Sequence, residues 1–247
     1  MIVRGQPEVF QIVLQPDHGQ LAGDLALAWA DRGPRHESLV TAARRHDDGW
    51  AVWERSPRVD SDGRPVAVYD VAITSHLAFY RAGIASVTEE DAYAGLLVSM
   101  HGAGIYQHRY GSDMTLSMTA AAQAQDQVDA FVAEQEAGHE AAAAALGVDE
   151  ELRWADYHRL QYVDRLSAAF CGRDFDDPEL EPIEIGDYTV EPLGPWNARI
   201  TPWPLDTPTA TFTVPRRKFE RRARQSDEFR EALLAEQPQL VELTLQA

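Results

Sequence analysis

Residues 42–50 read AARRHDDGW, and this stretch decides the fold and the site that we expect. It ends an apolar helical pattern that begins near Glu37. Neighbouring side chains diverge by about 100° on a straight helix, but Gly49 predicts the end of this helix directly after His46 and Asp47. Both groups can then converge on one ion. An imidazole and a carboxylate suit Zn, Fe, Mn or a similar divalent metal.

Helical periodicity continues on both sides of this stretch, so we expect a mainly α protein. Helices are predicted over about 18–31, 37–47, 70–82, 88–100, 117–145, 149–171 and 226–236, with a long loop over 54–69. Strands are predicted at 9–14 (VFQIVL), 209–214 (TATFTV) and 241–246 (VELTLQ). The basic cluster 216–224 is expected at the solvated start of the last helix. We therefore expect a helical domain over 1–172 and a β-containing segment over 173–247 that packs on it.

The composition limits the possible partners. The chain has 247 residues, and 22 Lys plus Arg against 40 Asp plus Glu give a net charge of -18. This acidity argues against nucleic-acid binding, which usually requires a clustered basic surface. No apolar stretch approaches the roughly 20 residues of a membrane span, and the single Cys171 permits no intramolecular disulfide. We expect a cytoplasmic protein with neither a nucleic-acid nor a membrane partner.

The order of the His and Asp residues resembles the HD-domain superfamily of metal-dependent phosphohydrolases and their di-iron relatives. That superfamily places a His, a His-Asp pair and a distant Asp on helices of an α-helical bundle. The matching residues are His18 in HGQLAGDLALAWA, His46 with Asp47, and Asp164 in YVDRLSAAF. The resemblance covers about residues 17–171 and implies an HD-like helical bundle with a small β-containing C-terminal segment.

Two further histidines resemble the second metal site of dinuclear members, such as HD-type cyclic-dinucleotide phosphodiesterases and inositol oxygenase. His76 lies 29 residues after Asp47, and His101 lies 25 residues after His76. The resemblance implies one or two ions of Fe, Mn, Zn or Co. Their ligands would be His18, His46, Asp47, His76, His101 and Asp164, with Asp47 and Asp164 as the catalytic carboxylates.

The sequence departs from the superfamily at Trp50, where many members carry a Lys three residues after the Asp of the pair. An aromatic side chain thus replaces a cation that could contact phosphate. Trp50 is expected to line the substrate pocket, together with Gln161, which shares a helix face with Asp164. The remaining histidines are expected in a loop or cap, or facing solvent: His36, His108, His139 and His158.

The resemblance implies a metal-dependent hydrolase that acts on a small, anionic, phosphorylated molecule through a metal-activated water. Two alternatives stay open. One is a di-iron oxygenase similar to inositol oxygenase, and the other is a helical protein that binds a ligand or partner without catalysis. The sequence contains no GxxxxGK[ST], GxGxxG, HExxH, CxxC or GxSxG motif. The chain also resembles an uncharacterised bacterial family with QxDH and HDxGW motifs, here at 15–18 and 46–50, and this likeness implies no function.

Overall fold

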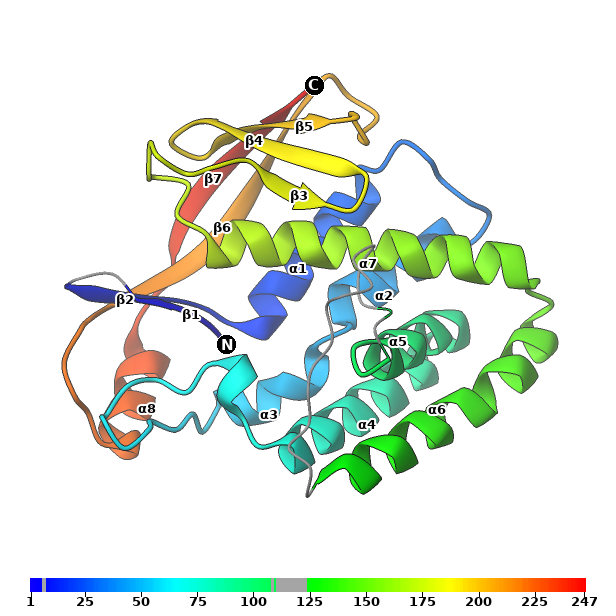
Figure 1. The fold of residues 1–247 in the computed structure, drawn as a ribbon, viewed down its shortest axis with the longest axis horizontal. Coiled ribbons are helices and arrows are strands. Elements are labelled where there is room, and N and C mark those ends of the chain that lie inside the picture. The colour runs from blue at the N-terminus through cyan, green and yellow to red at the C-terminus, as the bar shows by residue number, and fades with distance from the viewer. Residues whose placement is uncertain (6–7, 108, 110–123) are drawn as a thin grey trace.

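Both ends of the chain contribute strands to one curled sheet in the computed structural model, which describes residues 1–5, 8–107, 109 and 124–247. The seven strands lie in the order β1-β2-β6-β7-β5-β4-β3. Only β5 and β7 pair in parallel among these described strands. The last strand of the chain therefore lies at the centre of the sheet (Figure 1). The bounds are β1 Ile2–Gly5, β2 Val9–Val13, β3 Ile183–Ile185, β4 Tyr188–Gly194, β5 Asn197–Thr201, β6 Thr209–Glu220 and β7 Gln239–Gln246.

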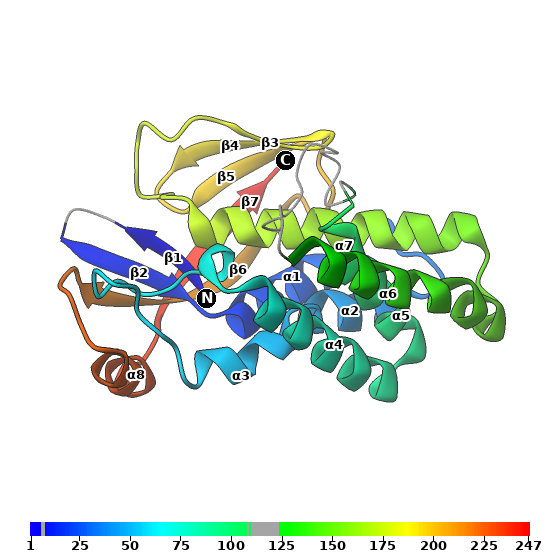
Figure 2. The same cartoon turned by 60° about the horizontal axis from the view of Figure 1, so that its bottom comes forward.

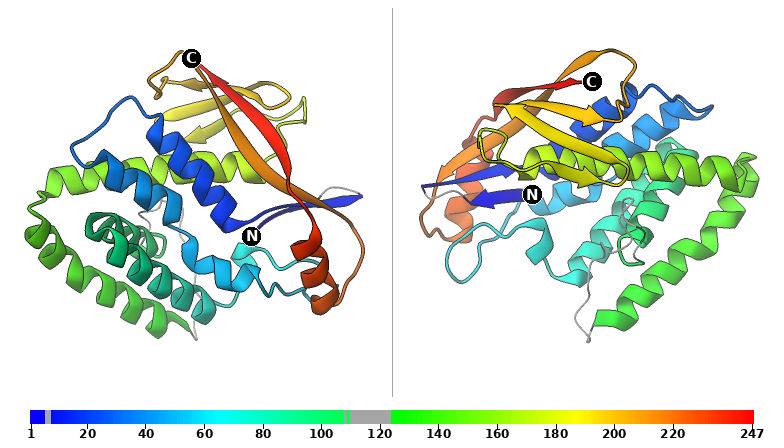
Figure 3. Two further views of the ribbon diagram at one scale, coloured as in Figure 1. Left: turned by 180° about the vertical axis from the view of Figure 1, so that it is seen from behind. Right: turned by 45° about the horizontal axis from the view of Figure 1, so that its top comes forward.

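The long strand β6 joins the two parts of the sheet. Its second half pairs with β2 and its first part pairs with β7, and the two long strands form a twisted ribbon in Figure 3. Phe212, Val214 and Arg216 are buried at alternate positions, as the two-residue period of a strand requires. Arg216 tolerates this position because its guanidinium lies 4.7 Å from the ring centre of Trp196 and 3.3 Å from Asp176 Oδ2.

Eight α-helices in the described part of the chain pack against the sheet and against one another. Helices α1 and α7 contact β6, while α4, α5 and α6 lie on the far side of α7 from the sheet (Figure 2). Helix α8 packs on β2 and β6 through Phe229 and Leu233. The bounds are α1 Gln15–Leu27, α2 His36–Arg45, α3 Ala51–Glu54, α4 Ile73–Glu90, α5 Ala92–Gly104, α6 Gln125–Leu146, α7 Glu150–Gly172 and α8 Ser226–Ala235, with short 3₁₀ turns η1 Asp48–Trp50 and η2 Val68–Asp70.

Two glycines allow the elements around the HDDG stretch to approach closely. A Cβ at Gly19 would lie 2.6 Å from the backbone oxygen of Arg44, so α1 and α2 cross at short range. A Cβ at Gly49 would lie only 1.9 Å from the backbone oxygen of Phe79, so η1 rests directly on α4. Any side chain at either position would push apart the elements that carry the predicted site.

The expected mainly α, HD-like bundle with a small β-containing C-terminal segment is wrong. About 52% of the structure is helix and 21% is strand, and the sheet also takes two strands from the N-terminus. Four strands were not predicted from the sequence: β1, β3, β4 and β5. In β3 to β5, charged residues and a proline interrupt the alternation of apolar and polar residues that marks a strand. The predicted solvated helix start at 216–224 was wrong for the same reason, because β6 continues through Arg216 to Glu220.

The predicted helices are confirmed with shifted ends, including the last one as α8. Of the helix expected over 117–145, residues 117–123 lie outside the described residues, and α6 begins at Gln125. Across the described residues, no helix is both long enough and apolar enough to cross a membrane. Apolar periodicity therefore located the helices, although it did not reveal the sheet on which they pack.

Candidate metal centre

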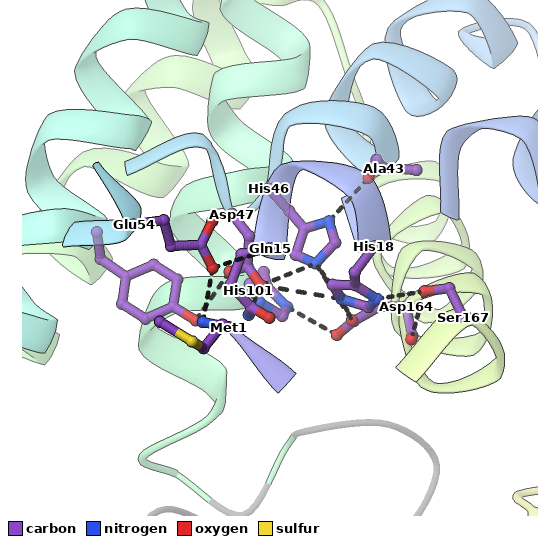
Figure 4. A network of polar contacts seen from close by, with 11 residues as sticks. Met1, Gln15, His18, Ala43, His46, Asp47, Glu54, His101, Asp164 and Ser167 are labelled. Atoms are coloured by element: carbon purple, nitrogen blue, oxygen red, sulfur yellow. Dashed lines mark hydrogen bonds and ion pairs between the residues drawn. The ribbon is translucent and has the colours of Figure 1, made fainter. Parts of the chain in front are cut away.

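Four side chains from three parts of the chain meet in the interior of the molecule (Figure 4). His18 comes from the first turns of α1, His46 and Asp47 from the end of α2, and Asp164 from α7. All four are buried, and the most exposed of them, Asp47, is 6% exposed. His18 Nε2 lies 3.2 Å from His46 Nε2 and 2.9 Å from Asp164 Oδ1.

The remaining distances complete a compact group of ligand atoms. His46 Nε2 lies 3.2 Å from Asp164 Oδ1 and 3.5 Å from Asp47 Oδ2, and His18 Nε2 lies 3.8 Å from Asp47 Oδ2. Ligand atoms that surround one ion at about 2.0–2.2 Å lie roughly 3 to 4 Å from one another. The distances from His18 and His46 therefore suit a transition-metal ion. The ligand atoms form two close groups that share His46: His18, His46 and Asp47, and His46, His101 and Asp164.

Hydrogen bonds outside the group determine which ring nitrogens face inward. His46 Nδ1 lies 2.7 Å from the carbonyl oxygen of Ala43, which can only accept, so Nδ1 carries the proton. Ser167 Oγ donates to the carbonyl oxygen of Asp164 and therefore accepts from His18 Nδ1 at 2.8 Å. In the neutral rings both Nε2 atoms are thus unprotonated. Two bare nitrogens and two carboxylate oxygens face one another, and this arrangement requires a positive charge between them.

The pKa values of His46 and Asp164 also indicate that a positive charge is needed between these groups. Burial lowers the pKa of His46, but Asp47 and Asp164 outweigh it and raise the pKa to about 10. Burial alone would raise the pKa of Asp164, yet the imidazoles of His46 and His18 hold it well below its usual range. In the metal-free protein, a proton on His46 therefore supplies the positive charge that an ion would supply.

Two neighbours fix the orientation of the Asp47 carboxylate. Gln15 Nε2 donates to Oδ2 at 2.6 Å, and the hydroxyl of Tyr80 donates to Oδ1 at 3.3 Å. The backbone of Gln15 donates in turn to Glu54 Oε1, which lies 2.6 Å from the α-ammonium of Met1 (Figure 4). Hydrogen bonds of this kind orient ligating carboxylates in metal sites.

Sequence reasoning missed Gln15, Tyr80 and Ser167 as supporting residues. Gln15 carried a usable signal, because residues three apart on a helix share a face and Gln15 precedes His18 by three positions. Ser167 lies three residues after Asp164 on the same helix, so the same spacing could have indicated it. Tyr80 carried none, since its contact with Asp47 depends on how α4 packs against η1.

The two further predicted histidines lie at different distances from this centre. His101, on α5, groups with His46 and Asp164, and its Nδ1 lies 3.8 Å from Asp164 Oδ2. His76 belongs to neither close His/Asp group within the described residues; its Nδ1 contacts the Tyr106 hydroxyl. Burial lowers the pKa of both His76 and His101 to about 4, so both rings are neutral near pH 7. The structure brings five of the six predicted ligands together and leaves His76 beside them.

The two residues predicted to line the pocket are both buried. Trp50 packs with Val68 and Val71, and its ring centre lies 4.7 Å from that of His76. Gln161 lies one turn before Asp164 on α7, and its side-chain amide donates to the backbone oxygen of Arg109. Contact of either side chain with a substrate stays a prediction.

The remaining histidines were expected in a loop or cap, or facing solvent, and the structure confirms this for only some of them. His158 is exposed, as expected, and His36 is the first residue of α2. His139 does not face solvent, because it is partly buried and its Nε2 lies 2.8 Å from Ser99 Oγ. His108 lies outside the described residues.

Fold and site together define a protein of mixed α and β structure with a buried His/Asp centre between the helices that pack on its sheet. The chain belongs to the family described as "Protein of unknown function (DUF3891)", which matches residues 1–221. No curated protein and no solved structure matches the chain. The expected membership of the HD-domain superfamily is wrong, since no HD-domain family matches and the seven-stranded sheet is foreign to an HD bundle. The match does agree with the expectation of an uncharacterised protein family.

Proposed function

We propose that this chain is a metal-dependent hydrolase that cleaves a small phosphorylated molecule. One observation carries the proposal: buried acceptor atoms of His18, His46, Asp47 and Asp164 lie close together. When both imidazole rings are neutral, neither Nε2 atom has a proton to donate to its neighbours. When bound, a divalent ion lowers the pKa of a water to roughly 7 and neutralises charge on a phosphoryl group.

The two carboxylates take different parts. Both oxygens of Asp47 accept hydrogen bonds, from Gln15 and Tyr80, so this side chain is a fixed anchor. Asp164 Oδ2 is buried and accepts no hydrogen bond from the residues that the structure describes. This oxygen, 3.8 Å from the neutral ring of His101, can therefore accept a hydrogen bond from the attacking water and orient it.

Water is the nucleophile because the nearby side chains are poor candidates. Cys171 is the only cysteine of the chain. Burial, reinforced by Asp17, raises the pKa of its thiol, so little thiolate forms near pH 7. Ser167 Oγ is already engaged with His18 and the backbone of Asp164. Direct attack by water therefore fits the site better than a covalent intermediate.

Hydrolysis is also favoured over the oxidative alternative. Di-iron chemistry needs a second ion, and His76 was the histidine expected to complete its site. Instead, His76 contacts Tyr106 and packs against Trp50, outside both close His/Asp groups of the described chain. We therefore propose one ion held mainly by His18, His46, Asp47 and Asp164, with His101 close to it in the group that it forms with His46 and Asp164.

Activity assays test this function directly. The purified chain, reconstituted separately with Mn²⁺, Fe²⁺, Co²⁺ and Zn²⁺, is assayed for phosphate release from a panel of nucleotides and sugar phosphates. We expect His46→Ala and Asp164→Asn to lower turnover by about 100-fold or more. His158→Ala, an exposed histidine on the same helix as Asp164, should retain turnover. A chain that binds an ion and turns over no phosphorylated compound would instead support binding without catalysis.

A further inference from the structure

A cavity of about 140 Å³ lies between α5, α6 and α7. It is lined by Met100, Arg109, Glu136, His139, Glu140, Arg153 and Trp154. A cavity of about 150 Å³ can hold a benzene molecule, so a phosphate or a small organic acid has room here. Trp154 precedes Asp164 by ten residues on α7, which corresponds to roughly 15 Å along the helix. The cavity is therefore separate from the metal centre.

The positive charges of this cavity are buried more deeply than the negative ones. The Arg153 side chain is 5% exposed, whereas Glu140, at 2.6 Å from it, is 83% exposed. Arg109 is 27% exposed, and Glu136, at 3.2 Å, is 41% exposed. Water screens an exposed carboxylate strongly, so these glutamates offset the buried guanidinium charges only in part. The two arginines therefore contribute more to the field inside the cavity than the two glutamates do.

Both guanidiniums also carry an unused donor. The Nε atoms of Arg109 and Arg153 are buried and have no hydrogen-bond partner among the described residues. Arg109 is steadied by Trp154, whose ring centre lies 5.5 Å from its guanidinium carbon. Guanidinium N–H groups pair with phosphate and carboxylate oxygens more strongly than with neutral acceptors. An oxyanion is therefore the partner that would suit these two donors best.

The histidine in the wall does not change this balance. Ser99 Oγ donates to Gln135 Oε1 and so accepts from His139 Nε2 at 2.8 Å. Burial lowers the pKa of His139 to about 4, so the ring is neutral near pH 7. The two arginines and their two screened glutamates then determine the charge of the cavity.

We propose that this cavity is an anion-binding site that holds a small oxyanion, a phosphate or carboxylate group, between Arg109 and Arg153. The site goes beyond the proposed hydrolase and does not depend on it, because no residue of the cavity belongs to the metal centre.

Calorimetric titration of the full chain tests the site. The protein is first treated with EDTA and dialysed, which removes ions that could themselves bind phosphate. It is then titrated with inorganic phosphate and, separately, with malonate, which distinguishes the two kinds of oxyanion. We expect saturable binding of at least one of them with one site per chain. Arg153→Gln and Arg109→Gln should each weaken binding by about tenfold or more.

The controls separate a specific site from general charge effects. Arg199→Gln alters an exposed arginine on β5 that pairs with Glu191, and it should leave anion binding unchanged. Arg153 is buried, so thermal melting checks that the Arg153→Gln variant still folds. If that variant does not fold, Arg109→Gln tests the site instead, because Arg109 is more exposed. Binding of neither anion, or equal binding by the wild type and both cavity variants, would overturn the proposal. Because the protein is metal-free, this result is independent of hydrolase activity.

Discussion

At the scale of single residues, the candidate metal centre depends on atoms that would not touch the ion themselves. Ser167 and the carbonyl of Ala43 place the protons of His18 and His46 on Nδ1, which leaves both Nε2 atoms available as ligands. A ring with the opposite tautomer would present a proton to the ion. The supporting hydrogen bonds therefore determine whether the cluster can bind metal at all.

Replacing Ser167 tests this role. Ser167→Ala removes the acceptor for His18 Nδ1, and we expect metal affinity to fall by about 10- to 100-fold while the ligands stay intact. Competition with a chromophoric chelator measures the affinity. Ser99→Ala is the matched control, because Ser99 is also buried and hydrogen-bonded to a histidine but lies outside the centre. An equal loss in both variants would point to a general effect on stability.

Metal affinity should also depend on pH through His46. Its pKa is raised to about 10, so the metal-free centre keeps a proton that an ion must displace. Apparent affinity should therefore rise with pH, by up to about tenfold per unit below pH 10, and level off above it. Titrations between about pH 6 and 9, in buffers of different ionisation enthalpy, measure the slope and the proton release. A flat profile without proton release would contradict the assignment.

At the scale of elements, the site depends on how closely η1 rests on α4. The turn Asp48–Trp50 follows the ligand Asp47, and Gly49 lets its backbone approach the carbonyl of Phe79. The same contact brings Tyr80 within reach of the Asp47 carboxylate. Packing between these two elements therefore controls the position of one ligand.

Gly49→Ala should disturb both stability and metal binding. The new Cβ would lie 1.9 Å from a backbone oxygen that cannot rotate away. We expect a loss of about 3 kcal/mol or more in the free energy of unfolding, and weaker metal affinity. Gly138→Ala is the control, because its Cβ would meet no atom within 4 Å. That variant should gain about 0.4–1 kcal/mol in urea unfolding. Similar effects of the two substitutions would refute the close packing.

At the scale of the whole molecule, strands from both ends of the chain hold the helices in place. The matched family region ends at residue 221, yet β7, at Gln239–Gln246, lies at the centre of the sheet. Leu243 and Leu245 in this strand are fully buried in the main core, to which α1 and α7 also belong. The sheet is therefore part of the scaffold that positions His18 and Asp164.

Two leucines of the same strand test the importance of β7. Leu243→Ala opens a cavity in the core and should lower the free energy of unfolding by about 2–5 kcal/mol. Leu240 is 68% exposed, so Leu240→Ala should change it by less than about 0.5 kcal/mol. Urea unfolding of the metal-free variants measures both values. Equally small losses would show that β7 is peripheral to the fold.

Local signals and long-range contacts explain what the sequence could predict. Helix positions follow from apolar periodicity, and Gly49 predicted that α2 ends close to the His46-Asp47 pair. The sheet depends on pairing between segments that are distant in the sequence. It also buries Arg216, whose guanidinium contacts Trp196 and Asp176. The surroundings of His76 could not be predicted for a similar reason, since its partner Tyr106 comes from beyond α5. Its role as a metal ligand stays a prediction.

The mistaken family has a related cause. The motif consists of a His, a His-Asp pair and a distant Asp. It determines only the short helical segments that carry these ligands and does not determine the rest of the fold. The same ligand set can therefore occur on different folds. The motif therefore predicted residues that the structure brings together, although the bundle and superfamily inferred from it were wrong.

Anomalous X-ray diffraction from crystals of the chain, grown without added metal and measured at the absorption edges of Fe, Mn, Co and Zn, tests the central claim most directly. We expect one strong peak at about 2.0–2.2 Å from His18 Nε2, His46 Nε2 and the facing oxygens of Asp47 and Asp164. The absence of a peak there, also after soaking with each ion, while the four side chains keep their positions, would contradict the account.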